Sequence, residues 1–427
     1  MPSPTDAHFQ ALDAWIDTHF DEEVRFLQAL VQVPTDTPPG NNTPHALRTA
    51  ELLGQFGWTP EVYPVPQDLV EPYGLQSLTN LIVRRALRSS AATATSPGLT
   101  VALNAHGDVV PPGEGWTHAP YGGEVVDGKL YGRAAAVSKS DFATYSFALR
   151  ALEALAAAPD APALQGQIEL HFTYDEEFGG ELGPGWLLKQ QLTRPDLLMA
   201  AGFSYEVVTA HNGCLQMEVT VHGVMAHAAI PHTGVDALQG AVTILQALYA
   251  QNTLYQATTS KVDGINHPYL NVGRIEGGTN TNVVPGKVVF KLDRRMIPEE
   301  DATVVEADIR HVIAEAAASY AGITVEVKRL LLAQSLQPLP GNAPLVDALQ
   351  RHAQTIFGER PPVKGTPLYT DVRLYCAQGI PAVIYGAGPR TVFESNAKRA
   401  DEHLVLEDLR KATKVVARTL LDLLQTR

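Results

Sequence analysis

The segment Leu99–Asp108, LTVALNAHGD, gives the clearest indication of the fold, because a short apolar strand pattern ends there at a polar His-Gly-Asp sequence. Around it, segments with helix periodicity alternate with segments that have a strand pattern. A helix is predicted over 141–158, a strand over 166–177 and a buried strand over 196–203. Strands that alternate with helices predict an α/β fold of three layers, in which helices cover both faces of a mostly parallel sheet. Ligands of such sheets gather at the carboxyl ends of the strands.

The segments on either side of this core are also patterned. Apolar residues at three-to-four spacing predict helices over 8–20, 22–33 and 44–57 near the N-terminus. The small polar stretch 89–98 is predicted to be a surface loop. After residue 335 the chain returns to a helix, strand and helix over 342–358, 381–388 and 406–424.

Residues 213–334 have a different character and are interpreted as an inserted domain. Strands are predicted over 215–223, 269–278, 286–296 and 323–331, and helices over 235–251 and 299–321. Two helices on a four-stranded antiparallel sheet make a compact α+β unit. The expected organisation is therefore a first domain in two parts, 1–212 and 335–427, with the second domain between them.

The composition excludes several classes of protein. The 427 residues are 45% hydrophobic and 18% charged, with a net charge of −14 and no dense Lys/Arg run, which argues against a nucleic-acid partner. No 18-residue apolar span and no signal-peptide pattern are visible, so the protein is expected to be cytoplasmic and away from membranes. Cys214 and Cys376 are expected to be reduced, structural thiols.

Two polar clusters follow predicted strands and could carry chemistry. His106 and Asp108 form an H-x-D pair, in which an imidazole can ligate a metal and the carboxylate can ligate or orient it. Asp175, Glu176 and Glu177 are adjacent carboxylates, which raise one another's pKa values unless a cation lies nearby. One could act as a general base and the next as a metal ligand. A solvated acidic turn is the structural alternative.

A set of ordered motifs resembles one known family. They are LNAHGDVVPPGEGW (103–116), DGKLYGR (127–133), DEEFGG (175–180), VHGVMAHAAIPHTGVDAL (221–238), GGTNTNVVPG (277–286), DRR (293–295), and YGAGP (385–389) with ADEHLVLEDL (400–409). Together they resemble the aminoacylase, acetylornithine deacetylase and succinyl-diaminopimelate desuccinylase family of zinc peptidases and amidases. The resemblance implies an α/β catalytic domain, an inserted lid domain that forms a homodimer, and two zinc ions that help to hydrolyse an amide next to a carboxylate.

The resemblance also implies roles for single residues of the catalytic domain. His106 and Glu177 match metal ligands, provided that a metal is retained. Asp108 matches the partner that orients His106, and Glu176 matches the general base.

In the inserted domain, His227 matches a histidine that stabilises the oxyanion, often across the dimer. Asn282 and Arg295 match residues that bind a small carboxylate-bearing substrate. Each has a structural alternative: His227 could be a satisfied structural histidine, Asn282 a turn residue, and Arg295 could pair with Asp293 or Glu299 on the surface of the lid.

The sequence departs from the family at three expected ligands. Val137 stands at the position of a metal-bridging aspartate, Gly202 at that of an acidic ligand, and Lys398 at that of a histidine. Two remaining ligands, from different metal subsites, are fewer than the three that a catalytic zinc requires. We therefore expect no metal or at most one ion, the latter with Asp141 or Glu206 as a displaced ligand.

Lys398 draws attention because an ammonium could offset the charge of Asp108, Glu176 and Glu177. It could also bind the substrate, be structural, or act as an amine with a depressed pKa. Ser395–Lys398 fits S-x-x-K, but the companion motifs of serine–lysine enzymes are missing, and Lys139 beside Ser138 and Ser140 has no supporting site either.

Three functions remain open at this point. The first is a hydrolase of an amide or related C–N bond in an N-acyl amino acid or dipeptide-like compound, with Glu176 as general base and an altered or absent metal centre. The second is a conventional metal-dependent amidohydrolase with displaced ligands. The third is a non-catalytic protein that binds a small molecule on the same scaffold.

Overall fold

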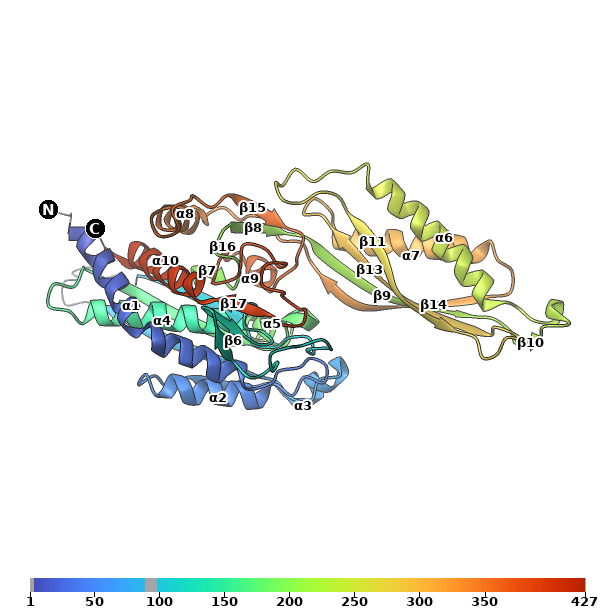
Figure 1. Cartoon of the computed structure of the whole chain (residues 1–427). Coiled ribbons are helices and arrows are strands. Elements are labelled where there is room, and N and C mark those ends of the chain that lie inside the picture. The colour runs from blue at the N-terminus through green and yellow to red at the C-terminus, as the bar shows by residue number, and fades with distance from the viewer. Residues whose placement is uncertain (1–3, 89–97, 427) are drawn as a thin grey trace. The chain divides into compact units, whose positions relative to one another are not determined.

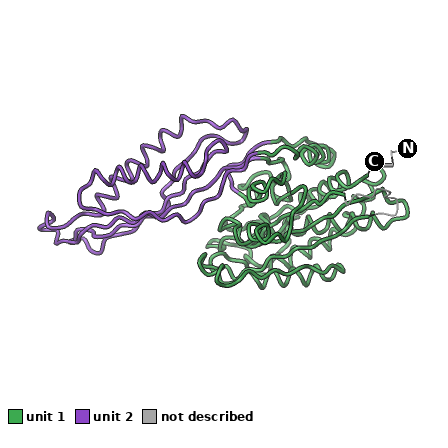
Figure 2. Tube along the Cα trace, turned by 180° about the vertical axis from the view of Figure 1, so that it is seen from behind, with its two compact units in different colours: residues 1–209, 338–363, 370–427 green, residues 210–337, 364–369 purple. Residues whose placement is uncertain are grey.

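The structure is a computed structural model that describes residues 4–88 and 98–426, so the predicted loop at 89–98 lies almost wholly outside the described residues. The chain forms two compact units (Figure 2). Unit 1 comprises Met1–Thr209, Pro338–Val363 and Thr370–Arg427, and unit 2 comprises Ala210–Gln337 with Lys364–Tyr369. Each unit has its own apolar core, one built around strands β2, β3 and β6 and the other around β9 and β13, whose bounds are given below.

The first sheet has eight strands in the order β1-β2-β6-β3-β7-β16-β8-β15. Their bounds are Glu61–Pro64, Thr79–Arg88, Gln165–Thr173, Leu99–His106, Leu197–Ala200, Ala382–Ile384, Val207–His211 and Val363–Thr366, in that order. The centre is parallel, since β3 pairs in parallel with β6 and β7, and β16 pairs in parallel with β7. β2 is antiparallel to both neighbours, and β16 is antiparallel to β8. The predicted α/β fold with a mostly parallel sheet is confirmed.

Helices of unit 1 pack on this sheet and on one another (Figure 1). They are α1 (Pro4–Val31), α2 (Thr43–Gly54), α3 (Gln67–Val70), α4 (Lys139–Ala156), α5 (Pro184–Lys189), α8 (Ala343–Phe357), α9 (Val372–Cys376) and α10 (Leu406–Leu424), with short 3₁₀ turns at Glu71–Tyr73 and Glu176–Phe178. α4 contacts β2, β3 and β6, and α1 and α10 both pack against α4. α9 contacts β7 and β16 and packs against α5.

The prediction of two separate N-terminal helices was wrong. One helix, α1, runs continuously from Pro4 to Val31. Asp21, the one residue between the two predicted segments, is compatible with a helix, and no Gly or Pro interrupts 5–33.

Unit 2 is a four-stranded antiparallel sheet in the order β11-β13-β9-β14, as predicted. Its strands are Tyr269–Gly277, Lys287–Met296, Gly213–His222 and Thr324–Ala333, and its helices are α6 (Ala237–Tyr255) and α7 (Ala302–Ala318), which pack side by side. Asp236 and Asp301 cap these helices, because each side chain accepts two backbone N–H groups of the first turn.

Smaller elements complete the described chain. β4 (Glu124–Val126), β5 (Lys129–Tyr131) and β17 (His403–Val405) form a three-stranded sheet in unit 1, in the order β17-β5-β4. β10 (Ala226–His227) pairs with β12 (Val283–Val284) in unit 2, near a 3₁₀ turn at Pro231–Thr233. Within the described residues, no helix is both long and apolar enough to cross a membrane.

Candidate active site

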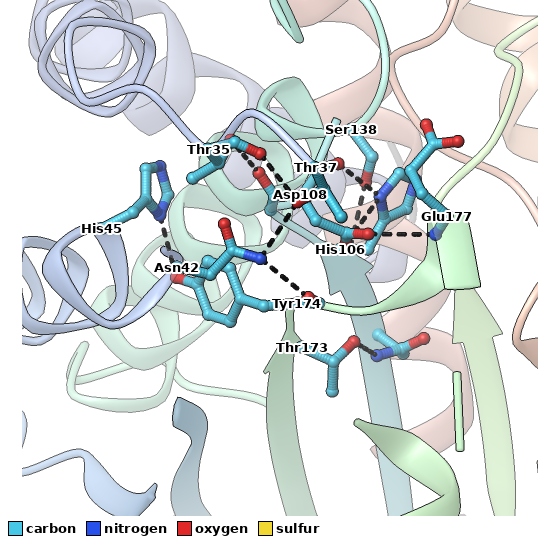
Figure 3. A network of polar contacts seen from close by, with 12 residues as sticks. Thr35, Thr37, Asn42, His45, His106, Asp108, Ser138, Thr173, Tyr174 and Glu177 are labelled. Carbon is cyan, nitrogen blue, oxygen red and sulfur yellow. Dashed lines mark hydrogen bonds and ion pairs between the residues drawn. The ribbon is translucent and has the colours of Figure 1, made fainter. Parts of the chain in front are cut away.

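The two polar clusters lie at neighbouring strand ends of unit 1. β3 and β6 are parallel, and their last residues, His106 and Thr173, are direct partners in the register. The turn that holds Asp108 and the turn that holds Glu176 and Glu177 therefore leave the sheet at the same edge (Figure 3). Cys214 and Cys376 lie elsewhere in the chain and are free thiols.

Asp108 is fully buried and connects these two turns. Its Oδ2 accepts the backbone N–H of Glu177 at 3.0 Å, and its Oδ1 lies 3.4 Å from Nδ1 of His106. Burial would lower the pKa of His106, but the hydrogen bond to Asp108 and the charge of Glu176 outweigh it and raise that pKa to about 10. The carboxylate of Asp108 thus lies against the imidazole of His106.

The Asp108 turn has a rigid polar support (Figure 3). Thr35 donates to the carbonyl of Gly107 at 2.6 Å, Asn42 donates to the carbonyl of Tyr174 at 3.0 Å, and His45 hydrogen-bonds the Tyr174 hydroxyl at 2.9 Å. A Cβ on Gly107 would lie 2.4 Å from the Tyr174 ring, so the glycine in H-G-D is required by close approach.

Glu176 and Glu177 begin the 3₁₀ turn Glu176–Phe178. Burial, together with the negative charges of Glu177 and Asp108, raises the pKa of Glu176 to about 7, although His106 and Lys398 oppose the shift. A carboxyl group that titrates near neutrality can accept a proton in one step and return it in the next. Its position and chemistry suit a general base.

Two residues that the sequence analysis missed lie beneath this turn. Arg373, 5% exposed, donates through Nη2 to the carbonyl of Gly179, directly after the Glu176 turn. Asp371, 4% exposed, lies so close to Gly180 that a Cβ there would be 2.1 Å from its Oδ1. Burial and the charges of Asp175 and Glu176 raise the pKa of Asp371 well above its usual range.

The only sequence signal for this pair was Thr-Asp before a short apolar helix, which resembles an ordinary N-cap. Asp371 does occupy the N-cap position of α9, but its side chain makes no capping hydrogen bond. The carboxylate is instead buried with the other acidic groups of the site.

Lys398 contacts the acidic cluster directly. Its Nζ lies 2.9 Å from Oε2 of Glu177, whose side chain is 10% exposed, whereas that of Lys398 is 53% exposed. Burial would lower the pKa of Lys398, but the charges of Glu177 and Glu176 raise it above its ordinary value. Lys398 is therefore a cation at neutral pH, and its alternative interpretation as an amine with a depressed pKa was wrong.

The residues of this edge do not fit a pair of zinc ions. Val137 has no donor atom, and a Cβ on Gly202 would lie 2.3 Å from Cγ2 of Ile384, so position 202 has no room for an acidic side chain. Asp141 is buried, and its Oδ1 accepts the N–H of Ala387 at 2.7 Å, so the backbone already uses this carboxylate. Over 4–88 and 98–426, no three His, Cys, Asp or Glu side chains are grouped as a metal site.

The predicted residues of unit 2 form two groups. β10 and β12 place His227 opposite Val283, beside Asn282, whose carbonyl accepts the N–H of Ala228 at 2.9 Å. Nδ1 of His227 accepts the N–H of Ala229 at 3.0 Å, and the imidazole is exposed.

Arg295 forms the second group. It donates through Nε to Asp293 at 2.7 Å and through Nη2 at 3.3 Å, the pairing considered as its structural alternative. Its guanidinium also lies 5.7 Å from the ring centroid of Tyr369.

The chain thus combines a mixed sheet, with Glu176 and the Asp108–His106 pair at its strand ends, with a separate antiparallel unit. Residues 102–422 match the peptidase family M20/M25/M40, and the chain belongs to this family. The chain is thus a hydrolase, and the family in general uses zinc or other divalent metals.

Individual relatives are similar over most of the chain. A succinyl-diaminopimelate desuccinylase of Methylobacterium nodulans is 28% identical over 92% of this chain and 94% of its own. The dipeptidase Dug1p of Saccharomyces cerevisiae has a TM-score of 0.76 at 15% identity, covering 97% of this chain and 98% of its own. The metallo-carboxypeptidase Sso-CP2 of Sulfolobus solfataricus has a TM-score of 0.75 at 18% identity, covering 93% and 98%.

Proposed function

We propose that this chain hydrolyses the amide bond of a small carboxylate-bearing substrate, such as an N-acyl amino acid or a dipeptide-like compound, with Glu176 as general base. The observation that carries the proposal is the pKa of Glu176, about 7, at a strand end shared with the Asp108–His106 pair. Relatives named as a desuccinylase and a dipeptidase support the substrate class.

In the proposed reaction, Glu176 accepts a proton from water as the water oxygen bonds to the amide carbon. The same proton then moves to the amide nitrogen as the C–N bond breaks, which releases a carboxylic acid and an amine. Asp108 orients His106, and Arg373 holds the backbone directly after the Glu176–Phe178 turn, so both act as positioning residues.

Unit 2 is proposed to supply contacts to the substrate. Because Nδ1 of His227 accepts a backbone N–H, a neutral ring carries its proton on Nε2 and can donate to an oxyanion. Asn282 directly precedes β12, the strand paired with that of His227, and offers an amide. Arg295 is 32% exposed despite its pairing with Asp293, so part of its guanidinium remains accessible to a carboxylate.

The decisive measurement is hydrolysis of a panel of N-succinyl amino acids, N-acetyl amino acids and dipeptides, followed by amine release. Glu176→Gln should lower kcat by about 10²- to 10⁴-fold and leave substrate binding by calorimetry nearly unchanged. Glu114→Gln, at an exposed carboxylate, is the matched control and should retain full activity. Turnover by Glu176→Gln at the rate of the parent would remove Glu176 from the mechanism.

The same experiment separates the two alternative functions. A chain that binds members of the panel without releasing amine would be a non-catalytic binding protein. A chain that is active only after zinc is added would be a conventional metal-dependent amidohydrolase, which the side chains at 137, 202 and 398 argue against.

We further propose that two copies associate through unit 2. α6 contains no charged residue, and while one face covers the sheet, the opposite face exposes Leu238, Val242 and Tyr249, spaced four and seven residues apart. The neighbouring edge strand β11 exposes Ile275. A charge-free face can meet its own copy without like-charge repulsion, and an open strand edge favours pairing.

Light scattering after gel filtration tests this association. Val242→Glu combined with Tyr249→Lys should convert a dimer to a monomer with unchanged circular dichroism. Val304→Glu on α7, 57% exposed in the parent, is the matched control and should leave the mass unchanged. A monomeric parent chain would refute the proposal.

A further inference from the structure

Lys398 lies in a turn whose backbone is held by a hydrogen bond to a buried carboxylate. Its φ is 62°, a left-handed conformation that is uncommon for a residue with a Cβ. The backbone N–H of Lys398 donates to Oε2 of Glu402 at 3.3 Å, and Glu402 is 1% exposed. A buried carboxylate therefore determines where the ammonium of Lys398 can reach.

Glu402 also holds the segment that leads to Val137. It accepts the N–H of Ala136 at 3.2 Å through Oε1 and is paired with Arg133 at 2.6 Å through Oε2. Ala136 directly precedes Val137, so the carboxylate of Glu402 contacts the backbone at or next to both Val137 and Lys398. These are two of the positions at which the sequence lacks an expected metal ligand. The side chains of Val137 and Lys398 therefore extend from backbone segments that the same carboxylate holds together.

The ammonium of Lys398 lies beside Glu177, the carboxylate that a divalent ion would need as a ligand. Among the described residues, Glu177 is the one side-chain acceptor within hydrogen-bond distance of Nζ. An ammonium has three donors, so two remain for other oxygens. The half-exposed side chain leaves these donors accessible from solvent, whereas Glu177 is buried beneath.

We propose that Lys398 is the resident cation of this centre: its ammonium takes the place of a metal ion beside Glu177 and binds an anionic oxygen of the substrate with its remaining donors. The second part depends on the proposed function, because it requires an anionic substrate. The first part does not, because it concerns metal affinity alone.

Zinc binding of the full chain, measured by competition with a chromogenic chelator, tests the first part without an activity assay. The parent chain should bind less than about one tenth of an equivalent of zinc at micromolar concentration. Val137→Asp combined with Lys398→His should bind about one equivalent, because the new carboxylate and imidazole would complete a set of three ligands with Glu177. Adding Glu177→Gln to this pair should lower the zinc affinity at least 100-fold.

Two results would overturn the proposal. One is tight binding of one or more zinc equivalents by the parent chain, and the other is a well-folded double variant that binds no more zinc than the parent. Tryptophan fluorescence and circular dichroism identify variants that fail to fold. Should the double variant fail to fold, Lys398→His alone decides: it should bind zinc at least tenfold more tightly than Lys398→Met, and equal affinities would overturn the proposal.

The second part is tested with whichever substrate the panel identifies. Lys398→Met should raise KM at least tenfold, Lys398→Arg should restore most of the loss, and turnover by the parent should resist a zinc chelator. An unchanged KM in Lys398→Met would refute substrate binding by Lys398. If no substrate is found, the proposed function fails while the zinc measurement still stands.

Discussion

The Glu402–Arg133 pair should be the most sensitive point of the catalytic unit. Both side chains are 1% exposed and their charged atoms lie 2.6 Å apart. Burial raises the pKa of Glu402 in spite of Arg133, which indicates that desolvation offsets much of the attraction between them. Removing one partner is nevertheless costly, because it leaves the other charge buried without compensation.

The perturbation is Glu402→Gln, which conserves shape and removes one charge. Arg133 would lose its opposite charge and face a neutral amide, beside the carbonyl of Pro112, at 2.9 Å, and the face of Trp116, 5.2 Å from its guanidinium carbon. We expect a loss of about 3–5 kcal/mol in the free energy of unfolding, the range for broken buried pairs. Replacing both residues, as Glu402→Leu with Arg133→Met, should cost less than the single change.

Urea unfolding followed by tryptophan fluorescence measures this loss for unit 1, which contains Glu402 and Arg133. All four tryptophans of the chain lie in unit 1: Trp15, Trp58, Trp116 and Trp186. Glu51→Gln is the control, because its pair with Arg48 is exposed, and it should change stability by less than about 0.5 kcal/mol. A loss below about 1 kcal/mol in Glu402→Gln would refute the reasoning, since the pair would not then behave as buried.

Two further predictions concern stability. Gly202→Ala should cost about 1–3 kcal/mol in urea unfolding, because its Cβ would overlap Ile384, whereas Gly54→Ala, with open space around it, should be neutral or slightly stabilising; equal effects would contradict the packing described. Burial raises the pKa of Glu23 to about 8 from 4.5 even though Thr413 donates to it. The protonated Glu23 side chain makes its full contribution to stability below pH 4.5. This contribution is lost as the pH rises from 4.5 through 8, at up to about 1.4 kcal/mol per pH unit. Glu23→Gln should therefore gain stability relative to the parent between pH 5 and pH 8, and parallel pH profiles would show that Glu23 does not titrate in this range.

Local patterns predicted those parts of the fold and site that depend on strand periodicity. Alternating strands and helices gave the α/β architecture, and parallel strand ends explain why His106 and Asp108 meet the turn of Glu176 and Glu177. These relations follow from the chain direction of β3 and β6, which an apolar pattern reveals.

Other parts of the site depend on close approaches between distant segments. Arg373 reaches Gly179 from a position 194 residues away in the chain, and no periodicity announces such a contact. The lack of room at Gly202 depends on the side chain of Ile384 in β16, which the sequence alone does not place. The pKa of Lys398 could not be assigned a direction before its distance from Glu177 was known.

The close packing at Gly202 has a consequence for how this chain could change by mutation. Val137 and Lys398 can each be exchanged for a side chain with a donor atom by one amino-acid substitution. Position 202 differs, because a Cβ there would lie 2.3 Å from Cγ2 of Ile384 in β16, so the Ile384 side chain would first have to shift. We therefore expect a directed-evolution experiment that starts from this sequence to regain the metal position beside Glu177 by substitutions at 137 and 398, whereas the other position also requires repacking around Ile384.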